Sequence, residues 1–239
     1  TEQHRIDSMR KDFVANVSHE LRTPLTVVTG FLDMILNGPE VDQKTLHGQL
    51  ELMQEEANRM QNLVNDLLTL SRLENKDDTA EDEPEIVSMT KLVPGLAEDG
   101  IALSRGRHLI DTQITTDKAI LGHVDEIRSA CLNLVTNAVR YTPDGGKILI
   151  SWHYDPETQS CIYSVQDNGI GIAEEDIPRL TERFYRVDKS RSREKGGTGL
   201  GLAIVKHVAI RNGCQLKIES QLGKGSTFSL IFPKNITLD

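Results

Sequence analysis

The chain has few aromatic residues, few cysteines and no long apolar run. Aromatic side chains make up 4% of the 239 residues, so a hydrophobic core has to consist mostly of aliphatic side chains. Cys131, Cys161 and Cys214 form neither a Cys-x-x-Cys pair nor a Cys/His zinc spacing, and small buried thiols in a reducing compartment are the simplest interpretation. No apolar run approaches the roughly 18 residues of a membrane-spanning helix.

Basic residues are also in the minority. With 27 Lys and Arg against 36 Asp and Glu, the formal net charge is −9. General nucleic-acid binding needs a basic face, so this balance argues against contact with nucleic acid.

Two common nucleotide-binding motifs are missing. The stretch Gly223-Lys224-Gly225-Ser226 has neither the upstream glycine nor the Lys-Ser/Thr pair of a P-loop, and the GxGxxG spacing of dinucleotide-binding folds is absent.

Apolar residues recur at steps of three and four in the first third of the chain, in two segments separated by Asn37-Gly38-Pro39. The first set is Val17, Leu21, Pro24, Val28, Phe31 and Ile35. The second set is Leu46, Leu50, Met53, Ala57, Met60, Val64 and Leu67. This heptad pattern predicts two helices that form a hairpin. Since two such helices make a thin core, we expect two hairpins to pair as a homodimeric four-helix bundle.

The composition changes after residue 74. Seven acidic residues lie between Glu74 and Glu85, which is typical of a linker. Strand-like stretches then follow at about 148–152, 161–165, 216–220 and 227–232, and helical stretches at about 90–104, 124–141 and 200–211. We therefore predict a hairpin domain over 1–74, a linker over 75–85 and a two-layer α/β sandwich over 86–239.

One histidine of the first helix has a suggestive setting. With Val17 and Leu21 in the seam, His19 points outward, Thr23 lies one turn later on the same face, and Glu20 is adjacent. Pro24 removes a backbone hydrogen bond and should bend the helix there. An exposed helical histidine usually has no special role, so this arrangement alone is weak.

Four blocks in the sandwich carry polar residues or glycines. Asn133 and Asn137 share a helix face, and amide oxygens suit Mg²⁺, although a polar helix surface explains them too. Asp167 is followed by Asn168-Gly169-Ile170-Gly171, which fits either adenine recognition or a simple turn. Arg183-Phe184-Tyr185-Arg186 opens a basic stretch that suits a polyphosphate or a solvated loop. Residues 196–202, Gly-Gly-Thr-Gly-Leu-Gly-Leu, precede a helix and suit phosphate binding or a hinge.

The stretch from Phe13 to Leu25, Phe-Val-Ala-Asn-Val-Ser-His-Glu-Leu-Arg-Thr-Pro-Leu, resembles the H-box of sensor histidine kinases. The resemblance implies that His19 accepts a phosphoryl group and that Glu20 hydrogen-bonds the imidazole and acts as base. It places Thr23 where relatives orient water when they dephosphorylate a partner. Arg22 is left open between a contact with phosphate, a salt bridge and a solvated charge.

The four blocks, in this order, resemble the N, G1, F and G2 boxes of the Bergerat ATP-binding fold. The resemblance implies binding of ATP with Mg²⁺, with Asn137 as metal ligand and Asn133 by the phosphates. It places Arg140 near phosphate and Tyr141 near adenine, and it has Asp167 read adenine. The other residues that it assigns to the nucleotide site are Gly169, Gly171, Arg183, Gly197, Thr198, Gly199, Leu200 and Gly201. Residues 173–198 would form a mobile lid over ATP.

Residues 180–189 and 199–207 resemble, more narrowly, the phosphate-regulon sensor kinases, although Thr181-Glu182-Arg183 departs from the common pattern. We therefore expect autophosphorylation of His19, transfer to an aspartate of a response-regulator receiver domain, dephosphorylation of that partner and a role in phosphate starvation. The polar start of the chain suggests a piece of a longer protein, and the resemblance implies the cytoplasmic portion of an inner-membrane sensor. A gyrase- or chaperone-type ATPase and a non-catalytic dimeric scaffold are the alternatives.

Overall fold

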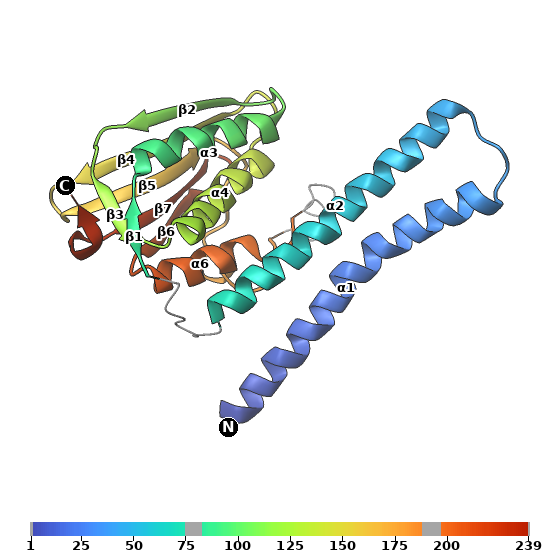
Figure 1. The fold of residues 1–239 in the computed structure, drawn as a ribbon, viewed down its shortest axis with the longest axis horizontal. Helices are drawn as coiled ribbons and strands as arrows, with labels where there is room; N and C mark the ends of the chain where they lie inside the picture. Colours follow the sequence, from blue (N-terminus) through green and yellow to red (C-terminus); the bar gives the residue numbers. More distant parts are fainter. Residues whose placement is uncertain (1, 75–82, 188–196, 239) are drawn as a thin grey trace.

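The first two helices form a long hairpin. The computed structural model describes residues 2–74, 83–187 and 197–238, and for residues 2–10 and 12 only the backbone. Helix α1 spans Glu2–Asn37 and α2 spans Gln43–Glu74. Asp42 caps α2, because its carboxylate accepts hydrogen bonds from the Thr45 amide at 2.9 Å and the Thr45 hydroxyl at 3.0 Å. The turn between the helices lies at the end of the molecule remote from the rest of the chain (Figure 1).

The hairpin seam uses only part of the heptad pattern. All six apolar residues predicted for α1 are buried or half-buried, and α1 continues through Pro24. On α2, however, Leu50 and Val64 are 47% and 43% exposed, and Ala57 is exposed too. One chain therefore leaves part of the α2 stripe exposed, and the predicted pairing of two hairpins would cover this part. Helix α2 also packs on the α/β domain, because Leu70, at 1% exposed, belongs to the core cluster of that domain.

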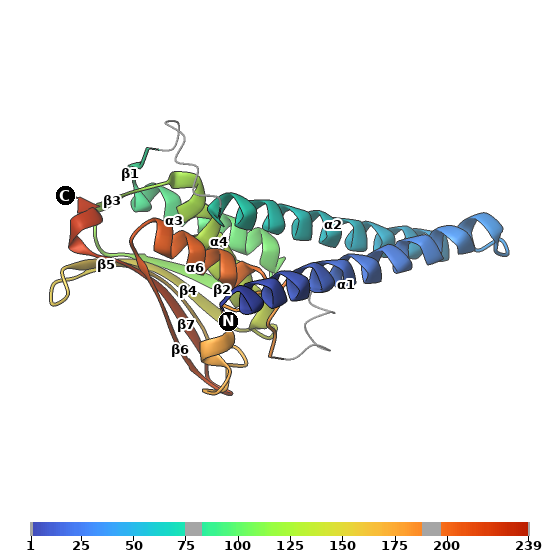
Figure 2. The same ribbon diagram turned by 90° about the horizontal axis from the view of Figure 1, so that it is seen from below.

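The rest of the chain is an α/β sandwich, as predicted. Its five-stranded sheet has the order β2-β4-β5-β7-β6, and the helices cover one face of it (Figure 2). Its strands are β2 (Leu109–Ile114), β4 (Lys147–Asp155), β5 (Ser160–Asp167), β6 (Gln215–Gln221) and β7 (Gly225–Phe232). The helices are α3 (Met89–Ser104), α4 (Val124–Tyr141) and α6 (Gly201–Arg211).

Two features of this domain were not predicted from the sequence. The first is β2, which pairs in parallel with β4, while the other pairs of this sheet are antiparallel. The second is a small sheet with the order β1-β3-β8, formed by Glu85–Val87, Ala119–Gly122 and Thr237–Leu238. These strands are short or exposed at an edge, so they carry too little apolar alternation to be seen. Two short 3-10 helices, Ile177–Arg179 and Lys234–Ile236, complete the described elements.

The core lies between the sheet and α3, α4 and α6. Trp152 and Tyr163, both fully buried on neighbouring strands, are its largest side chains. The Trp152 ring meets the edge of Phe232 at a centroid distance of 5.9 Å, and its indole N–H donates to the Lys118 carbonyl at 3.2 Å. This core fixes α4 and α6 side by side, and α2 of the hairpin lies along α6 (Figures 1 and 2).

Candidate functional site

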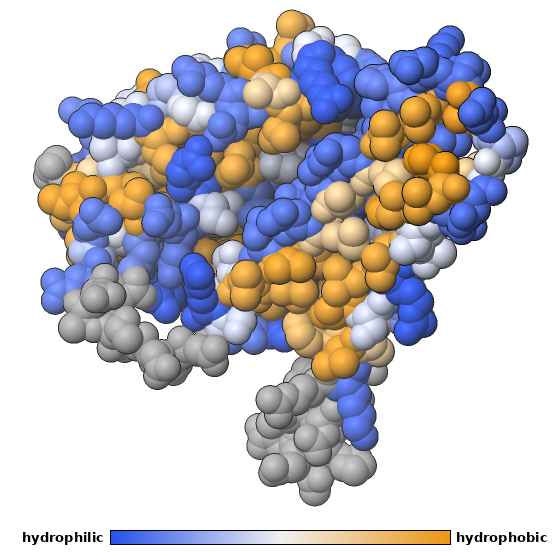
Figure 3. Space-filling model, turned by 45° about the vertical axis from the view of Figure 1, so that its right-hand side comes forward, coloured by the Kyte–Doolittle hydropathy of each residue, from blue (hydrophilic) through white to orange (hydrophobic). Residues whose placement is uncertain are grey.

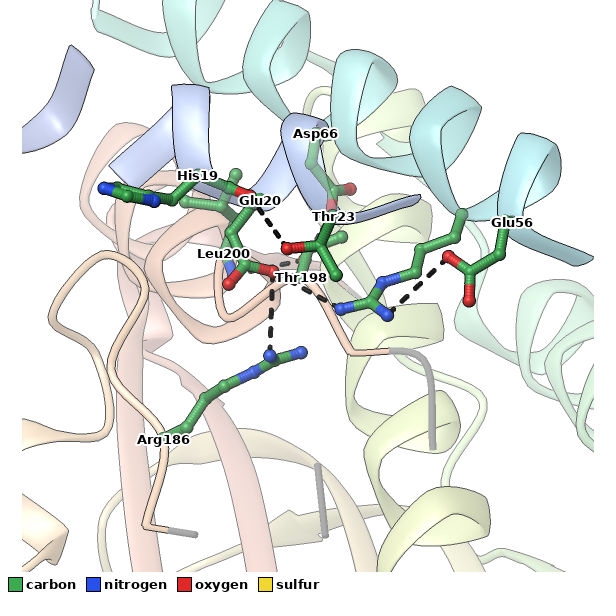
Figure 4. A network of polar contacts seen from close by, with 9 residues as sticks. His19, Glu20, Thr23, Glu56, Asp66, Arg186, Thr198 and Leu200 are labelled. Atoms are coloured by element: carbon green, nitrogen blue, oxygen red, sulfur yellow. Dashed lines mark hydrogen bonds and ion pairs between the residues drawn. The ribbon is translucent and has the colours of Figure 1, made fainter. Parts of the chain in front are cut away.

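His19 lies on the exposed face of α1, beside the contact between the hairpin and the α/β domain. The hydroxyl of Thr23, one turn later, donates to the His19 carbonyl at 3.3 Å. In Figure 4, the His19 ring points away from Arg186, while the Glu20 carboxylate points toward it. The predicted face with an exposed histidine and a threonine is therefore present.

Glu20 does not hold the imidazole in this structure. Its carboxylate lies 3.4 Å from Arg59 of α2. It also lies 3.7 Å from Arg186 of the α/β domain (Figure 4). Adjacent residues of a helix point in directions about 100° apart, so Glu20 and His19 face different neighbours. The predicted hydrogen bond between Glu20 and His19 therefore requires that the Glu20 carboxylate leave Arg59 and Arg186.

The two amides of α4 lie next to the start of α6. The Asn133 side chain donates to the Ser129 carbonyl at 2.9 Å, and its oxygen would be 2.6 Å from a Cβ atom added at Gly201. Asn137 is half-buried one turn later, and the described residues provide no hydrogen-bond partner for its amide. The face of α4 with both amides thus meets the amino end of α6.

Asp167 ends β5 and is 7% exposed. Burial raises the pKa of its carboxyl group, and the amide hydrogens of Gly169 and Ser226 oppose this shift. The Gly169 amide donates to Asp167 Oδ1 at 2.8 Å, and the Ile170 amide donates to the Tyr141 carbonyl at 3.2 Å. Asp167 and Gly169 are thereby brought to the carboxyl end of α4, where Tyr141 lies.

Gly171 approaches another backbone segment too closely for any side chain. Its φ is +64°, and an added Cβ atom would lie 2.0 Å from the Gln221 carbonyl oxygen. We expect Gly171→Ala to lower the free energy of unfolding by about 3 kcal/mol, because the left-handed backbone and the clash both oppose a side chain. Denaturant unfolding of the whole chain measures the change.

Gly145 provides the matched control. Its φ of +82° is similar, but no atom lies within 4 Å of its added Cβ atom. Gly145→Ala should therefore cost only about 1 kcal/mol, the backbone part of the penalty. Equal losses of stability in the two variants would contradict the close approach at Gly171.

Residues 197–201, which we call the glycine loop, lead into α6. The Thr198 hydroxyl donates to Asp66 of α2 at 2.7 Å and accepts from the Leu200 amide at 3.2 Å. Gly199 has a φ of +73° and its carbonyl accepts from the Phe184 amide at 2.8 Å. These bonds fix the glycine loop at the amino end of α6. The partial positive charge of a helix amino end favours a bound anion.

Two arginines from different elements lie against the loop. An added Cβ atom at Gly197 would be 3.2 Å from one guanidinium nitrogen of Arg140 and 3.2 Å from one of Arg186. Burial lowers the pKa of both guanidinium groups. The side chain of Arg186 is only 6% exposed, and its Nε and Nη2 atoms have no hydrogen-bond partner within the described residues. Buried donors without a partner are costly, so this corner of the site is suited to a bound anion.

Arg183, which the sequence analysis assigned to the nucleotide, points elsewhere. It forms an ion pair with Glu74 at the end of α2, and its guanidinium lies 5.4 Å from the centre of the Phe13 ring. Arg186 is the residue that the sequence analysis missed, although it stands in the same quoted block. Residues 188–196, the basic part of the predicted lid, lie outside the described residues, as do residues 75–82 of the predicted linker.

The donor set for a metal is limited. Among the described residues, no group of three His, Cys, Asp or Glu side chains is placed to hold a metal ion. An amide oxygen together with phosphate oxygens is the kind of set that Mg²⁺ accepts, since it keeps several water ligands. The free amide of Asn137 fits one position of such a set.

None of the helices in the described parts of the chain has the length and apolar character of a membrane span.

Two family models match the chain. The His Kinase A (phospho-acceptor) domain matches residues 9–76. The histidine kinase-, DNA gyrase B-, and HSP90-like ATPase matches residues 122–236. The two matches cover the hairpin and most of the α/β domain, which contain His19 and the four blocks respectively.

Individual proteins are similar over nearly the whole chain. The phosphate regulon sensor protein PhoR of Pseudomonas aeruginosa is 52% identical over 97% of this chain, which spans 52% of that protein. Among solved structures, the histidine kinase AdeS of Acinetobacter baumannii is 26% identical with a TM-score of 0.69, over 91% of this chain and 98% of that one. The histidine kinase ThkA, solved in complex with the response regulator TrrA, is 23% identical with a TM-score of 0.74, over 98% of this chain and 64% of that one. The last likeness concerns the fold alone.

Proposed function

Because the chain belongs to the sensor histidine kinases, we propose that it transfers the γ-phosphoryl group of ATP to its own His19. The observation that supports this most directly is the meeting of the two parts of the chain. Glu20, the neighbour of His19, pairs with Arg186, and Arg186 lies against Gly197 of the glycine loop. The acceptor helix and the proposed phosphate site therefore adjoin.

The nucleotide would lie between α4, the end of β5 and the glycine loop. Asp167 would accept a hydrogen bond from the adenine amino group beside Gly169, Gly171 and Tyr141. The glycine loop, with Gly197, Thr198, Gly199, Leu200 and Gly201, would hold the phosphates through its amides. Asn133, Arg140 and Arg186 would contact phosphate oxygens, and Asn137 would bind Mg²⁺. Bound there, Mg²⁺ supplies positive charge that neutralises the phosphates.

In the transfer step, a nitrogen of the neutral His19 imidazole attacks the γ-phosphorus. The P–N bond forms as the bond to the β–γ bridging oxygen breaks, ADP leaves, and Glu20 takes the imidazole proton. Catalysis rests on positioning and on charge stabilisation by the arginines. Before Glu20 can take this proton, a movement of the α/β domain along the hairpin has to separate it from Arg186, and its carboxylate has to turn away from Arg59 of the same hairpin.

The hairpin would pair with that of a second copy of this chain. Leu25, Leu50, Val64 and Leu68 are between 43% and 53% exposed in the single chain. Figure 3 shows apolar side chains gathered along the hairpin. Pairing of two hairpins into a four-helix bundle would bury them.

The phosphohistidine would pass its group to an aspartate of a response-regulator receiver domain that docks near His19. The similarity to the Pseudomonas protein supports phosphate-starvation signalling. We further propose that the chain, which spans 52% of that relative, acts as the cytoplasmic portion of an inner-membrane sensor, as its resemblance to the sensor kinases implies.

Labelling tests the activity. Incubation with γ-labelled ATP and Mg²⁺ should give protein-bound label that is lost in acid and stable in base, as expected of phosphohistidine. Release of labelled inorganic phosphate without protein-bound label would instead indicate an ATPase of the gyrase type. Absence of both products, together with no nucleotide binding by calorimetry, would indicate a non-catalytic scaffold.

The proposed phosphatase role rests on Thr23. We expect Thr23→Ala to keep self-labelling but to slow dephosphorylation of the receiver domain about tenfold or more, because the hydroxyl orients the attacking water. Loss of phosphorylated regulator over time measures this rate.

Thr26 offers a matched control on the same helix. Its hydroxyl donates to the Arg22 carbonyl at 2.8 Å, as that of Thr23 does to the His19 carbonyl. Thr26→Ala should change neither rate. If Thr23→Ala lost both activities equally, a folding defect rather than a phosphatase role would be the cause.

A further inference from the structure

The negatively charged carboxylate of Asp66, on α2, lies at the glycine loop. Its carboxylate accepts the Thr198 hydroxyl at 2.7 Å, and that hydroxyl in turn accepts from the Leu200 amide, directly before α6 begins at Gly201. The carboxylate therefore lies near the positive amino end of α6, where a negative charge is stabilised. Figure 4 shows Asp66 reaching from α2 toward Thr198.

A guanidinium group completes the surroundings of this carboxylate. Burial raises the pKa of Asp66, while the Thr198 hydroxyl and the positive charge of Arg140 oppose the shift. Arg140 belongs to α4, so three elements converge on one carboxylate. A hydroxyl, a helix amino end and an arginine are the groups with which proteins hold phosphate.

The rest of the hairpin reinforces the same contact. Glu20 pairs with Arg186, Glu74 pairs with Arg183, and the Phe13 ring lies 5.8 Å from that of Phe184. Phe184 has a φ of +61°, an uncommon backbone for a bulky residue. Both helices thus hold the segment that precedes the glycine loop as well as the loop itself.

We propose that Asp66 competes with the phosphates of the nucleotide for the glycine loop, so that bound nucleotide and the docked hairpin exclude each other at this contact. The inference rests on the proposed function, because it assumes that the loop binds the phosphates of ATP. Coupling of this kind is reciprocal: the docked hairpin weakens nucleotide binding, and the nucleotide releases the hairpin by the same free energy. Release would also separate Glu20 from Arg186 and allow the α/β domain to approach His19.

Calorimetry of the whole chain with Mg²⁺ and a non-hydrolysable ATP analogue tests the competition. We expect Asp66→Asn and Asp66→Ala to lower the Kd about fivefold, because the competing charge is removed. Glu55→Gln is the matched control, since Glu55 is an exposed carboxylate on the same helix, and it should bind as the parent chain does. An unchanged or higher Kd in both Asp66 variants, with normal binding by the parent chain, would overturn the competition alone.

A second measurement needs no variant. Saturation of the parent chain with the analogue should speed hydrogen exchange of the α2 amides around residues 66–70, because Asp66 and Leu70 contact the α/β domain in the docked state. Unchanged exchange at saturation would overturn the proposal. If the parent chain bound no nucleotide at all, the proposed function would fail together with the competition, an outcome distinct from binding without release.

Discussion

Replacement of His19 by glutamine should abolish self-labelling by γ-labelled ATP. Glutamine keeps a polar side chain on the exposed face of α1 but has no nucleophilic nitrogen that can accept the phosphoryl group. Acid-labile label on the protein should therefore fall to the background of the assay. Filter binding after alkaline and acid washes measures the label.

His47 supplies the control for this variant. It is an exposed histidine on the other helix of the hairpin, with a side chain 75% accessible, and it lies near Glu51 at 3.3 Å. His47→Gln should label as the parent chain does. Acid-labile label that survived in His19→Gln would refute His19 as the acceptor, provided that the variant still bound the ATP analogue in calorimetry.

Asn137→Ala should reduce self-labelling about 100-fold or more, because the proposed Mg²⁺ ligand is lost and the phosphate charge would be less well neutralised. Alanine has the higher helix propensity, so α4 should remain intact. Nucleotide binding gives a second measurement. Mg²⁺ should tighten the binding of the ATP analogue to the parent chain much more than to Asn137→Ala.

Gln113 is a suitable control for the loss of an amide. It is exposed on the edge strand β2 of the same domain, and its backbone alone takes part in the pairing with β4. Gln113→Ala should keep both labelling and the Mg²⁺ effect. A normal Mg²⁺ effect in Asn137→Ala would show that the metal is held by other groups.

Several elements could be predicted because their signals are local in the chain. The helix from Val124 to Tyr141 was predicted with the bounds that the structure has, since its apolar period and polar face are complete within eighteen residues. The end of α1 at Asn37 follows from Gly38 and Pro39 in the same way. The exposed position of His19 followed from the heptad, because a residue between seam positions has to face outward.

Other features could not be predicted, because they depend on how distant segments are placed. Arg183 and Arg186 look equally suited to phosphate in the sequence, and only the path of the chain turns one toward Glu74 and the other toward Gly197. The same holds for Glu20, whose partner Arg59 is 39 residues away. The parallel edge strand β2 has too few apolar residues to be recognised without its neighbour β4.

The sequence by itself thus determined which residues the proposed chemistry uses: a histidine on a helical hairpin as the proposed acceptor, and a set of amides, one aspartate and glycines that suit a nucleotide. Local periodicity and turn chemistry are enough to place such residues on their elements. Only the tertiary structure decided which charges meet. The bond from Thr198 to Asp66 joins residues 132 positions apart in the chain, and it exists because α2 packs along α6. No pattern within one element contains that information, since it depends on how the packed apolar faces of two domains orient their polar residues.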